Sequence, residues 1–249
     1  LASERDQSQK ILLRVTPGIE AHTHSFIQTG QIDSKFGFGL VEGVAMDAIA
    51  QAFASPHLDL VGLHAHLGSQ IFQLEAFRKA IEILVKLIGE AHDRLGFECR
   101  YLNVGGGLGI RYTEEDMPAS IADYVSVKVE GVRKEMQGLG LPMPRVLIEP
   151  GRSIVGKAGI TAYTVGTIKK VPGVRTYVSV DGGMSDNIRP MLYDAQYEGM
   201  IANRASEPAD TMVTVAGKHC ESGDILIRDA HIARPEPGDL LVIPATGAY

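Results

Sequence analysis

The chain has 249 residues, of which 45% are hydrophobic and 22% are charged, a composition typical of a globular protein with one large or two modest domains. The formal net charge of −6, without any long basic block, argues against nucleic acid as a partner. No apolar run approaches the ~18 residues that a membrane span requires, and no signal peptide is visible. The two cysteines, Cys99 and Cys220, give no disulfide framework and fit a reducing, cytoplasmic compartment.

Strands and helices alternate through the first part of the chain. Short apolar runs that end at turn residues predict strands, and apolar residues at helical spacing predict the helices between them. The predicted strands are Ile11–Val15, Leu58–His66, Arg100–Val104 and Arg145–Glu149, the helices are Val41–Ala54, Leu74–Leu95 and Ile121–Leu139, and His22–Gly39 is a long loop. This alternation predicts a parallel sheet, either part of a barrel or a doubly wound sheet.

The pattern changes after Ser153, where strand-like runs follow one another with few helical stretches. These runs, rich in Val, Ile, Thr and Tyr, are Ile160–Lys170, Tyr177–Asp181, Met212–Ala216 and Leu240–Pro244. We therefore expect an α/β domain over residues 1–155 and a mostly β domain over 156–249. The first residue is not Met and the last follows directly on an apolar strand, so we expect a fragment of a longer protein.

A glycine run, Gly105-Gly106-Gly107 with Gly109, follows the third predicted strand. Glycines leave no Cβ between a ligand and the backbone N–H groups, so such a turn can cradle a phosphate. Enzymes built on parallel barrels carry their chemistry at this end of their strands. A plain flexible turn is the alternative interpretation.

Two other strand ends carry groups suited to a phosphorylated heteroaromatic ligand. One carries His64 and His66, with Ser69 just beyond, and the other carries Glu149 and Arg152. Ser69, the glycines and Arg152 could hold a phosphate, His66 could stack on a ring, and Glu149 could bind a protonated ring nitrogen. The alternatives are a metal pair at the two histidines, a simple ion pair of Glu149 with Arg152, and a helix cap at Ser69.

The β part carries a second group of candidates. Arg189 follows the turn-rich segment Asp181–Asp186 and could bind a carboxylate through its two-pronged guanidinium, although a solvated arginine is the alternative. Cys220 lies beside the acidic residues Glu221 and Asp224, which favour a protonated thiol and hence a proton donor rather than a nucleophile. A buried structural cysteine is the alternative.

Together these segments resemble the ornithine/diaminopimelate/arginine decarboxylase family of pyridoxal-phosphate enzymes, which has an alanine-racemase-like fold. Each motif alone has modest specificity, but eight of them occur in the family's order across nearly the whole chain. The segments are Ser34–Phe38, Gly62–Gln70, Gly105–Gly109, Glu149–Arg152, Asp181–Asp186, Arg189–Tyr193, Cys220–Asp224 and Gly247–Tyr249.

The resemblance implies the C-terminal part of a (β/α)8 barrel, namely its last four strands, followed by a β domain. It implies pyridoxal 5'-phosphate (PLP) as cofactor, with Glu149 at the pyridine nitrogen and His66 stacked on the ring. The implied cofactor contacts are His66, Ser69, Gly105, Gly106, Gly107, Glu149, Pro150, Gly151, Arg152 and Tyr249. The implied substrate contacts are Arg152, Arg189, Tyr193, Glu221 and Tyr249, and no metal is expected.

The resemblance also implies a reaction, the decarboxylation of meso-2,6-diaminopimelate at its D-centre to give L-lysine and CO₂. Cys220 would supply the proton and would reach into the partner's site in a homodimer with shared active sites. A distal carboxylate on the substrate would suit Arg189, and a distal amine would suit Glu221. One departure from the family is the missing Schiff-base lysine, which supports a fragment that is inactive alone.

Three other functions remain open from the sequence. One is an ornithine- or arginine-type decarboxylase with the same fold. Another is a non-catalytic homologue, which the missing lysine favours and the retained Cys220, Glu149 and Arg189 disfavour. The third is a metal hydrolase that uses His64 and His66.

Overall fold

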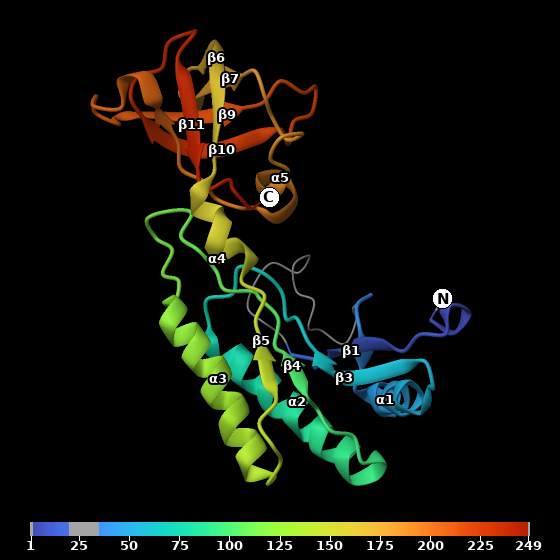
Figure 1. The fold of residues 1–249 in the computed structure, drawn as a ribbon. Helices are drawn as coiled ribbons and strands as arrows, with labels where there is room; N and C mark the ends of the chain where they lie inside the picture. The colour runs from blue at the N-terminus through green and yellow to red at the C-terminus, as the bar shows by residue number, and fades with distance from the viewer. Residues whose placement is uncertain (1, 20–34, 249) are drawn as a thin grey trace. The chain divides into compact units, whose positions relative to one another are not determined.

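The structure is a computed structural model that describes residues 2–19 and 35–248. It divides into two compact units, shown as a ribbon in Figure 1. The first unit comprises residues 1–109 and 118–151, and the second comprises 110–117 and 152–249. Residues 110–117 leave the first unit and return to it, so the division is not a single cut in the chain.

A five-stranded parallel sheet forms the centre of the first unit, with the strand order β2-β1-β3-β4-β5. The strands are β1 (Gln9–Thr16), β2 (Phe38–Gly39), β3 (Leu58–His64), β4 (Tyr101–Asn103) and β5 (Arg145–Leu147). The connecting helices are α1 (Val44–Ala54), α2 (Leu74–Leu95) and α3 (Ile121–Gly138), with 3-10 turns at Ser3–Arg5 and Val41–Gly43. This is the βα alternation that the sequence predicts.

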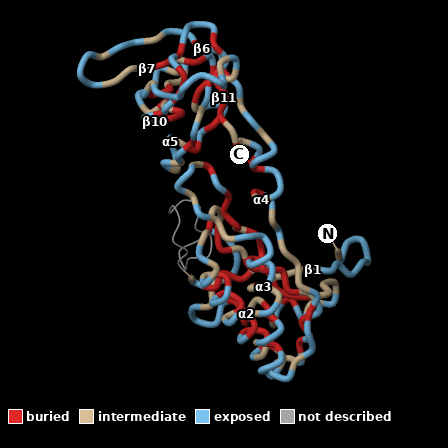
Figure 2. The backbone as a smooth tube through the Cα atoms, turned by 90° about the vertical axis from the view of Figure 1, so that its left-hand side faces the viewer, coloured by how far each residue is buried: buried red, intermediate tan, exposed pale blue. Residues whose placement is uncertain are grey.

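Local interactions define the start of α3 and the end of α2. The side chain of Ser120 accepts a hydrogen bond from the Asp123 N–H at 3.0 Å, which caps the start of α3. Gly96 ends α2 with a φ of 70°, a left-handed conformation that glycine adopts without a Cβ clash. Apolar side chains of α2 at helical spacing, among them Phe77, Ile81 and Leu84, are buried in the unit's cores. Figure 2 shows buried residues gathered inside each unit and exposed ones along its outer loops and helix faces.

The second unit is built on a six-stranded mixed sheet with the order β10-β9-β7-β6-β11-β8. All its pairings are antiparallel except that of β7 with β9. The strands are β6 (Ile160–Val171), β7 (Arg175–Val180), β8 (Met200–Ile201), β9 (Thr211–Ala216), β10 (Ile225–Ile232) and β11 (Leu240–Pro244). Short helices lie at α4 (Gly151–Val155) and α5 (Arg189–Tyr193), with 3-10 turns at Gly156–Ala158 and Ala202–Arg204.

The predicted fold class, an α/β part with parallel strands followed by a mostly β part, is confirmed. The structure adds strands that the sequence reading missed, namely β2, β8 and β10. Strand β10 was not predicted because its residues do not alternate regularly between buried and exposed positions. Register shifts interrupt its pairing with β9, and Asp229 within it has a φ of 52°. Among the described residues, no helix is both long enough and apolar enough to cross a membrane.

Candidate functional site

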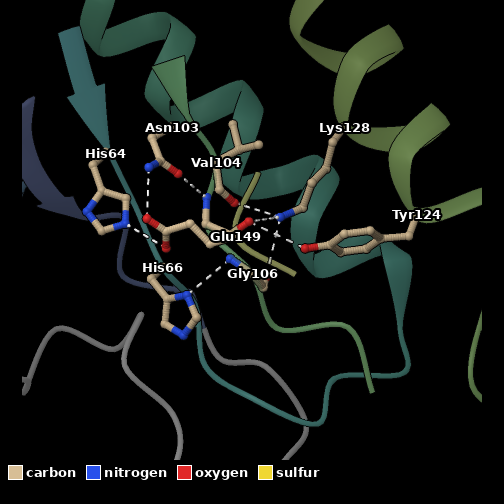
Figure 3. Close-up of polar contacts among 9 residues, drawn as sticks. His64, His66, Asn103, Val104, Gly106, Tyr124, Lys128 and Glu149 are labelled. Atoms are coloured by element: carbon tan, nitrogen blue, oxygen red, sulfur yellow. Dashed lines mark hydrogen bonds and ion pairs between the residues drawn. The ribbon is translucent and has the colours of Figure 1, made fainter. Parts of the chain in front are cut away.

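Three neighbouring strands of the first unit bring their carboxyl ends to one edge of the parallel sheet. Strand β4 lies between β3 and β5, with His64 paired to Asn103 and Asn103 paired to Leu147. Because parallel strands end at the same edge, the segments after β3, β4 and β5 meet there. Figure 3 shows the result, in which the histidines, the glycine turn and Glu149 converge on one another.

The glycine run fits tightly between the segments that follow β3 and β5. A Cβ on Gly105 would lie 2.4 Å from the Ala65 carbonyl oxygen, and one on Gly106 would lie 2.1 Å from the Glu149 carbonyl oxygen. Gly105 and Gly107 have φ values of +64° and +106°, which side chains rarely adopt. The geometry therefore favours a close-packed turn over a flexible one.

Asn103 links the glycine run to Glu149, and the sequence reading did not single it out. Its side-chain Nδ2 donates to Glu149 Oε1 at 2.8 Å, and its Oδ1 accepts from the Gly105 N–H at 2.9 Å. Asn103 is 8% exposed, whereas the Glu149 side chain is 48% exposed. Asn103 thus fixes one oxygen of the Glu149 carboxylate, while about half of the side chain stays accessible.

The two histidines have different partners. His64 Nε2 lies 3.5 Å from Glu149 Oε2, and burial lowers the pKa of His64 although Glu149 acts in the opposite direction. His66 lies beyond the end of β3, where its Nδ1 accepts a hydrogen bond from the Gly106 N–H at 3.2 Å. Burial, with a smaller contribution from Arg14, lowers the pKa of His66 to about 4, so its ring is neutral at pH 7.

A fully buried lysine lies on the other side of the glycine run. Lys128, on α3, is 0% exposed, and its Nζ donates to the carbonyl oxygens of Val104 (2.6 Å), Gly105 (2.9 Å) and Gly106 (3.3 Å). Burial lowers the pKa of Lys128 to about 7, while Glu149 acts to raise it. The sequence signal was its spacing, because Lys128 lies at four-residue intervals in line with Tyr124, Val132 and Met136, which form the buried side of α3.

In the second unit, two arginines are buried among tyrosines. The Arg152 guanidinium donates to the Tyr112 hydroxyl and, at 3.5 Å, to the Ala248 carbonyl oxygen. The Arg189 guanidinium donates to the Tyr197 hydroxyl and lies 4.6 Å from the centre of the Tyr112 ring. The exposed fractions of Arg152 and Arg189 are 9% and 5%, so Arg189 is not the solvated surface residue that the sequence left open. The sequence reading identified neither tyrosine.

The structure contradicts the alternative interpretation of Cys220. Cys220 is an exposed free thiol, not a buried structural one. Asp224, expected to act on this thiol, is 2% exposed, and its carboxylate accepts hydrogen bonds from the backbone N–H groups of Met184 (2.6 Å) and His219 (2.9 Å). Asp224 therefore joins the segment Asp181–Asp186 to the Cys220 loop, because the buried carboxylate needs these donors.

The other predicted site residues have diverse surroundings. Ser69 and Pro150 are partly buried, and Gly151 is exposed at the first position of α4. Tyr193, at the end of α5, is partly buried, and Glu221 is exposed with its Oε1 accepting from the Gly223 N–H at 3.1 Å. Tyr249 lies outside the described residues. Among residues 2–19 and 35–248, no group of three or more His, Cys, Asp or Glu side chains could hold a metal ion.

Residues 1–156 match a family described as "Pyridoxal-dependent decarboxylase, pyridoxal binding domain", which is more than half of the chain. The chain belongs to the pyridoxal-dependent decarboxylase family. The first unit, with its glycine turn and its Asn103–Glu149 pair, falls within the matched region.

The similarity to known relatives covers the whole chain. Diaminopimelate decarboxylase of Bacillus subtilis (strain 168) is 52% identical over 100% of the chain and 57% of the relative. The enzyme of that name from Bacillus methanolicus is 50% identical, over 100% of the chain and 58% of the relative. The chain therefore spans little more than half the length of these relatives.

Two solved structures are similar in fold. Diaminopimelate decarboxylase from Helicobacter pylori, complexed with L-lysine, has a TM-score of 0.86 at 34% identity, over 100% of this chain and 59% of that one. Diaminopimelate decarboxylase from M. jannaschii, in co-complex with L-lysine, has a TM-score of 0.88 at 33% identity, over 100% and 56%.

The residues of this chain fit PLP, the cofactor of its family. The half-exposed Glu149 carboxylate suits a protonated pyridine nitrogen, and the neutral imidazole of His66 suits an aromatic face. The glycines pack against the carbonyl oxygens of Ala65, Gly68 and Glu149, where a side chain would not fit. The carboxylate and the imidazole therefore suit the pyridine ring of PLP.

Proposed function

We propose that the intact protein decarboxylates meso-2,6-diaminopimelate at its D-centre to give L-lysine and CO₂. The observation that carries this proposal is the convergence of the Glu149 carboxylate, the His66 ring and the glycine turn at adjacent strand ends in a chain of this family. Identity of about half to proteins named diaminopimelate decarboxylase supports the choice of substrate.

We assign the cofactor contacts to the residues that the sequence singled out. Glu149 binds the pyridine N–H and keeps that proton on the ring, while Asn103 fixes the carboxylate through its 2.8 Å hydrogen bond. His66 covers one ring face. When bound, PLP supplies an electron sink for the pair that remains after CO₂ leaves. The phosphate contacts are Ser69, Gly107, Gly151 and Arg152, and the further cofactor contacts are Gly105, Gly106, Pro150 and Tyr249.

We assign substrate recognition to Arg189, Tyr193 and Glu221, with Arg152 and Tyr249. Arg189 is held by the Tyr197 hydroxyl and the Tyr112 ring, so its orientation is set before the substrate arrives. A distal carboxylate can pair with this guanidinium, and a distal amine can pair with Glu221. Substrates that lack the distal carboxylate, such as ornithine, leave the Arg189 charge without a partner.

We further propose a homodimer with shared active sites in the cytoplasm. The exposed thiol of Cys220 supports this arrangement, since a group that serves a partner's site must lie at its own chain's surface. Cys220 then donates the proton to the carbon that loses CO₂. Two free cysteines, Cys99 and Cys220, suit a reducing compartment.

The test is product formation from separate substrates by the intact protein. We expect L-lysine and CO₂ from meso-diaminopimelate, and no product from the LL isomer, which has no D-centre. Ornithine and arginine serve as matched substrates without a distal carboxylate. Faster release of CO₂ from either of these would favour the diamine-forming alternative, and no product from any substrate would favour a non-catalytic homologue.

A further inference from the structure

Lys128 is fully buried, and the proposed reaction assigns it no role. Its ammonium lies 4.6 Å from the centre of the Phe77 ring and 4.4 Å from that of Tyr124, and these two rings meet edge to face at 5.1 Å. Phe77 and Tyr124 are 2% and 1% exposed. A lysine enclosed in this way is costly to bury unless its N–H groups are satisfied.

The three carbonyl acceptors of Lys128 belong to three successive peptide groups, those after Val104, Gly105 and Gly106. An ammonium has three N–H donors, so one lysine matches the three carbonyls. The Tyr124 hydroxyl, also on α3, donates a further hydrogen bond of 3.4 Å to the Gly105 carbonyl oxygen. The carbonyl side of the glycine run is thus held from α3 (Figure 3).

Holding the carbonyls also sets the direction of the N–H groups. In a planar trans peptide the C=O and the N–H point in opposite directions. The Gly105 N–H accordingly reaches Asn103 Oδ1, and the Gly106 N–H reaches His66 Nδ1. By the same geometry, the Gly107 N–H points away from Lys128.

We propose that Lys128 is a positioning residue for phosphate binding, because it gathers the Val104, Gly105 and Gly106 carbonyls on one side and so turns the Gly107 N–H toward the PLP phosphate, while Asn103 and His66 hold the N–H groups of Gly105 and Gly106. This inference rests on the proposed function, from which the phosphate comes. Lys128 touches neither cofactor nor substrate in this role. The same ammonium adds a positive charge behind the turn, which favours a doubly charged anion on the opposite side.

The test compares PLP with pyridoxal, which has the same ring and no phosphate. Both ligands are offered to the intact protein and to its Lys128→Met variant, and equilibrium dialysis with the ligand's own absorbance gives each Kd. We expect Lys128→Met to weaken PLP binding about tenfold more than pyridoxal binding, the effect of losing hydrogen bonds to a charged group. Lys134→Met is the matched control, since Lys134 lies on the same helix with 81% of its side chain exposed.

The outcomes separate this inference from the proposed function. If the wild-type protein binds PLP no more tightly than pyridoxal, the proposed phosphate site itself is wrong. If the wild type prefers PLP and Lys128→Met keeps that preference, only the role of Lys128 is wrong. Should Lys128→Met not fold, Lys128→Gln retains two N–H donors, and the same comparison applies to it. Failure of both variants to fold would make Lys128 purely structural and overturn the inference.

Discussion

Burial acts on His66 and Lys128 in the same direction, because both lose water that would solvate their charged forms. The two side chains differ in the groups to which they are hydrogen-bonded. Lys128 has three carbonyl acceptors that favour its charge, whereas the His66 Nδ1 is occupied as an acceptor for the Gly106 N–H. That hydrogen bond requires an unprotonated Nδ1, so protonation of His66 would break a contact of the glycine turn.

The titration of His66 tests this arrangement. We expect its imidazole signals in NMR to titrate near pH 4 in the folded protein, because the folded-state pKa is lowered to about 4 from its usual 6.5. Between pH 6.5 and 4 the unfolded chain then binds more protons, so His66 makes stability fall as the pH falls through this range. His66→Gln identifies the signals and should flatten this part of the pH dependence, and His231→Gln, at an exposed position, should not. Titration at the ordinary pKa would contradict the buried, accepting His66.

At the scale of elements, strand ends position the site, and the glycine turn is where three of them meet. Gly106→Ala would place a Cβ 2.1 Å from the Glu149 carbonyl oxygen, which is backbone and has little freedom to move. We expect a loss of about 2 kcal/mol or more in the free energy of unfolding, measured in urea, and weaker PLP binding. The control is Gly138→Ala at the end of α3, where no atom lies within 4 Å, and a gain of up to about 1 kcal/mol is expected. Equal effects of the two substitutions would contradict the close packing of the turn.

Periodic elements were predictable from sequence, and contacts between elements were not. Helix α2 runs from Leu74 to Leu95 as predicted, because a long apolar stripe and a closing glycine define it locally. Strand β10 was missed, because Asp229 interrupts its alternation. The side chains of His66 and Glu149 could be predicted to lie at the same edge of the sheet, since they follow β3 and β5, the two parallel strands on either side of β4. The role of Asn103 could not be predicted, because it depends on a contact with Glu149, which is 46 residues away in the chain. The role of Lys128 could not be predicted either, because its acceptor Val104 lies 24 residues before it.

At the scale of the whole molecule, the candidate residues divide between the two units. His66, Ser69, the glycine run and Glu149 belong to the first, whereas Arg152, Arg189 and Cys220 belong to the second. The proposed homodimer, in which Cys220 serves the partner's site, would account for the position of this thiol in the second unit. The predicted boundary between residues 155 and 156 would place Arg152 with the first group, whereas the two compact units separate between residues 151 and 152.

Mixing two inactive variants tests whether active sites are shared. Cys220→Ala removes the proposed proton donor, and Glu149→Ala removes the group at the pyridine nitrogen, so we expect each intact protein alone to have little activity. If Cys220 serves the partner's site, each mixed dimer contains one site with both native residues. Random exchange makes about half of the dimers mixed, so about a quarter of the wild-type activity should return. If both residues act within one chain, every site in the mixture lacks one of them, and activity stays at the level of the single variants. Each variant mixed with itself is the control, and lysine release from meso-diaminopimelate is the measurement.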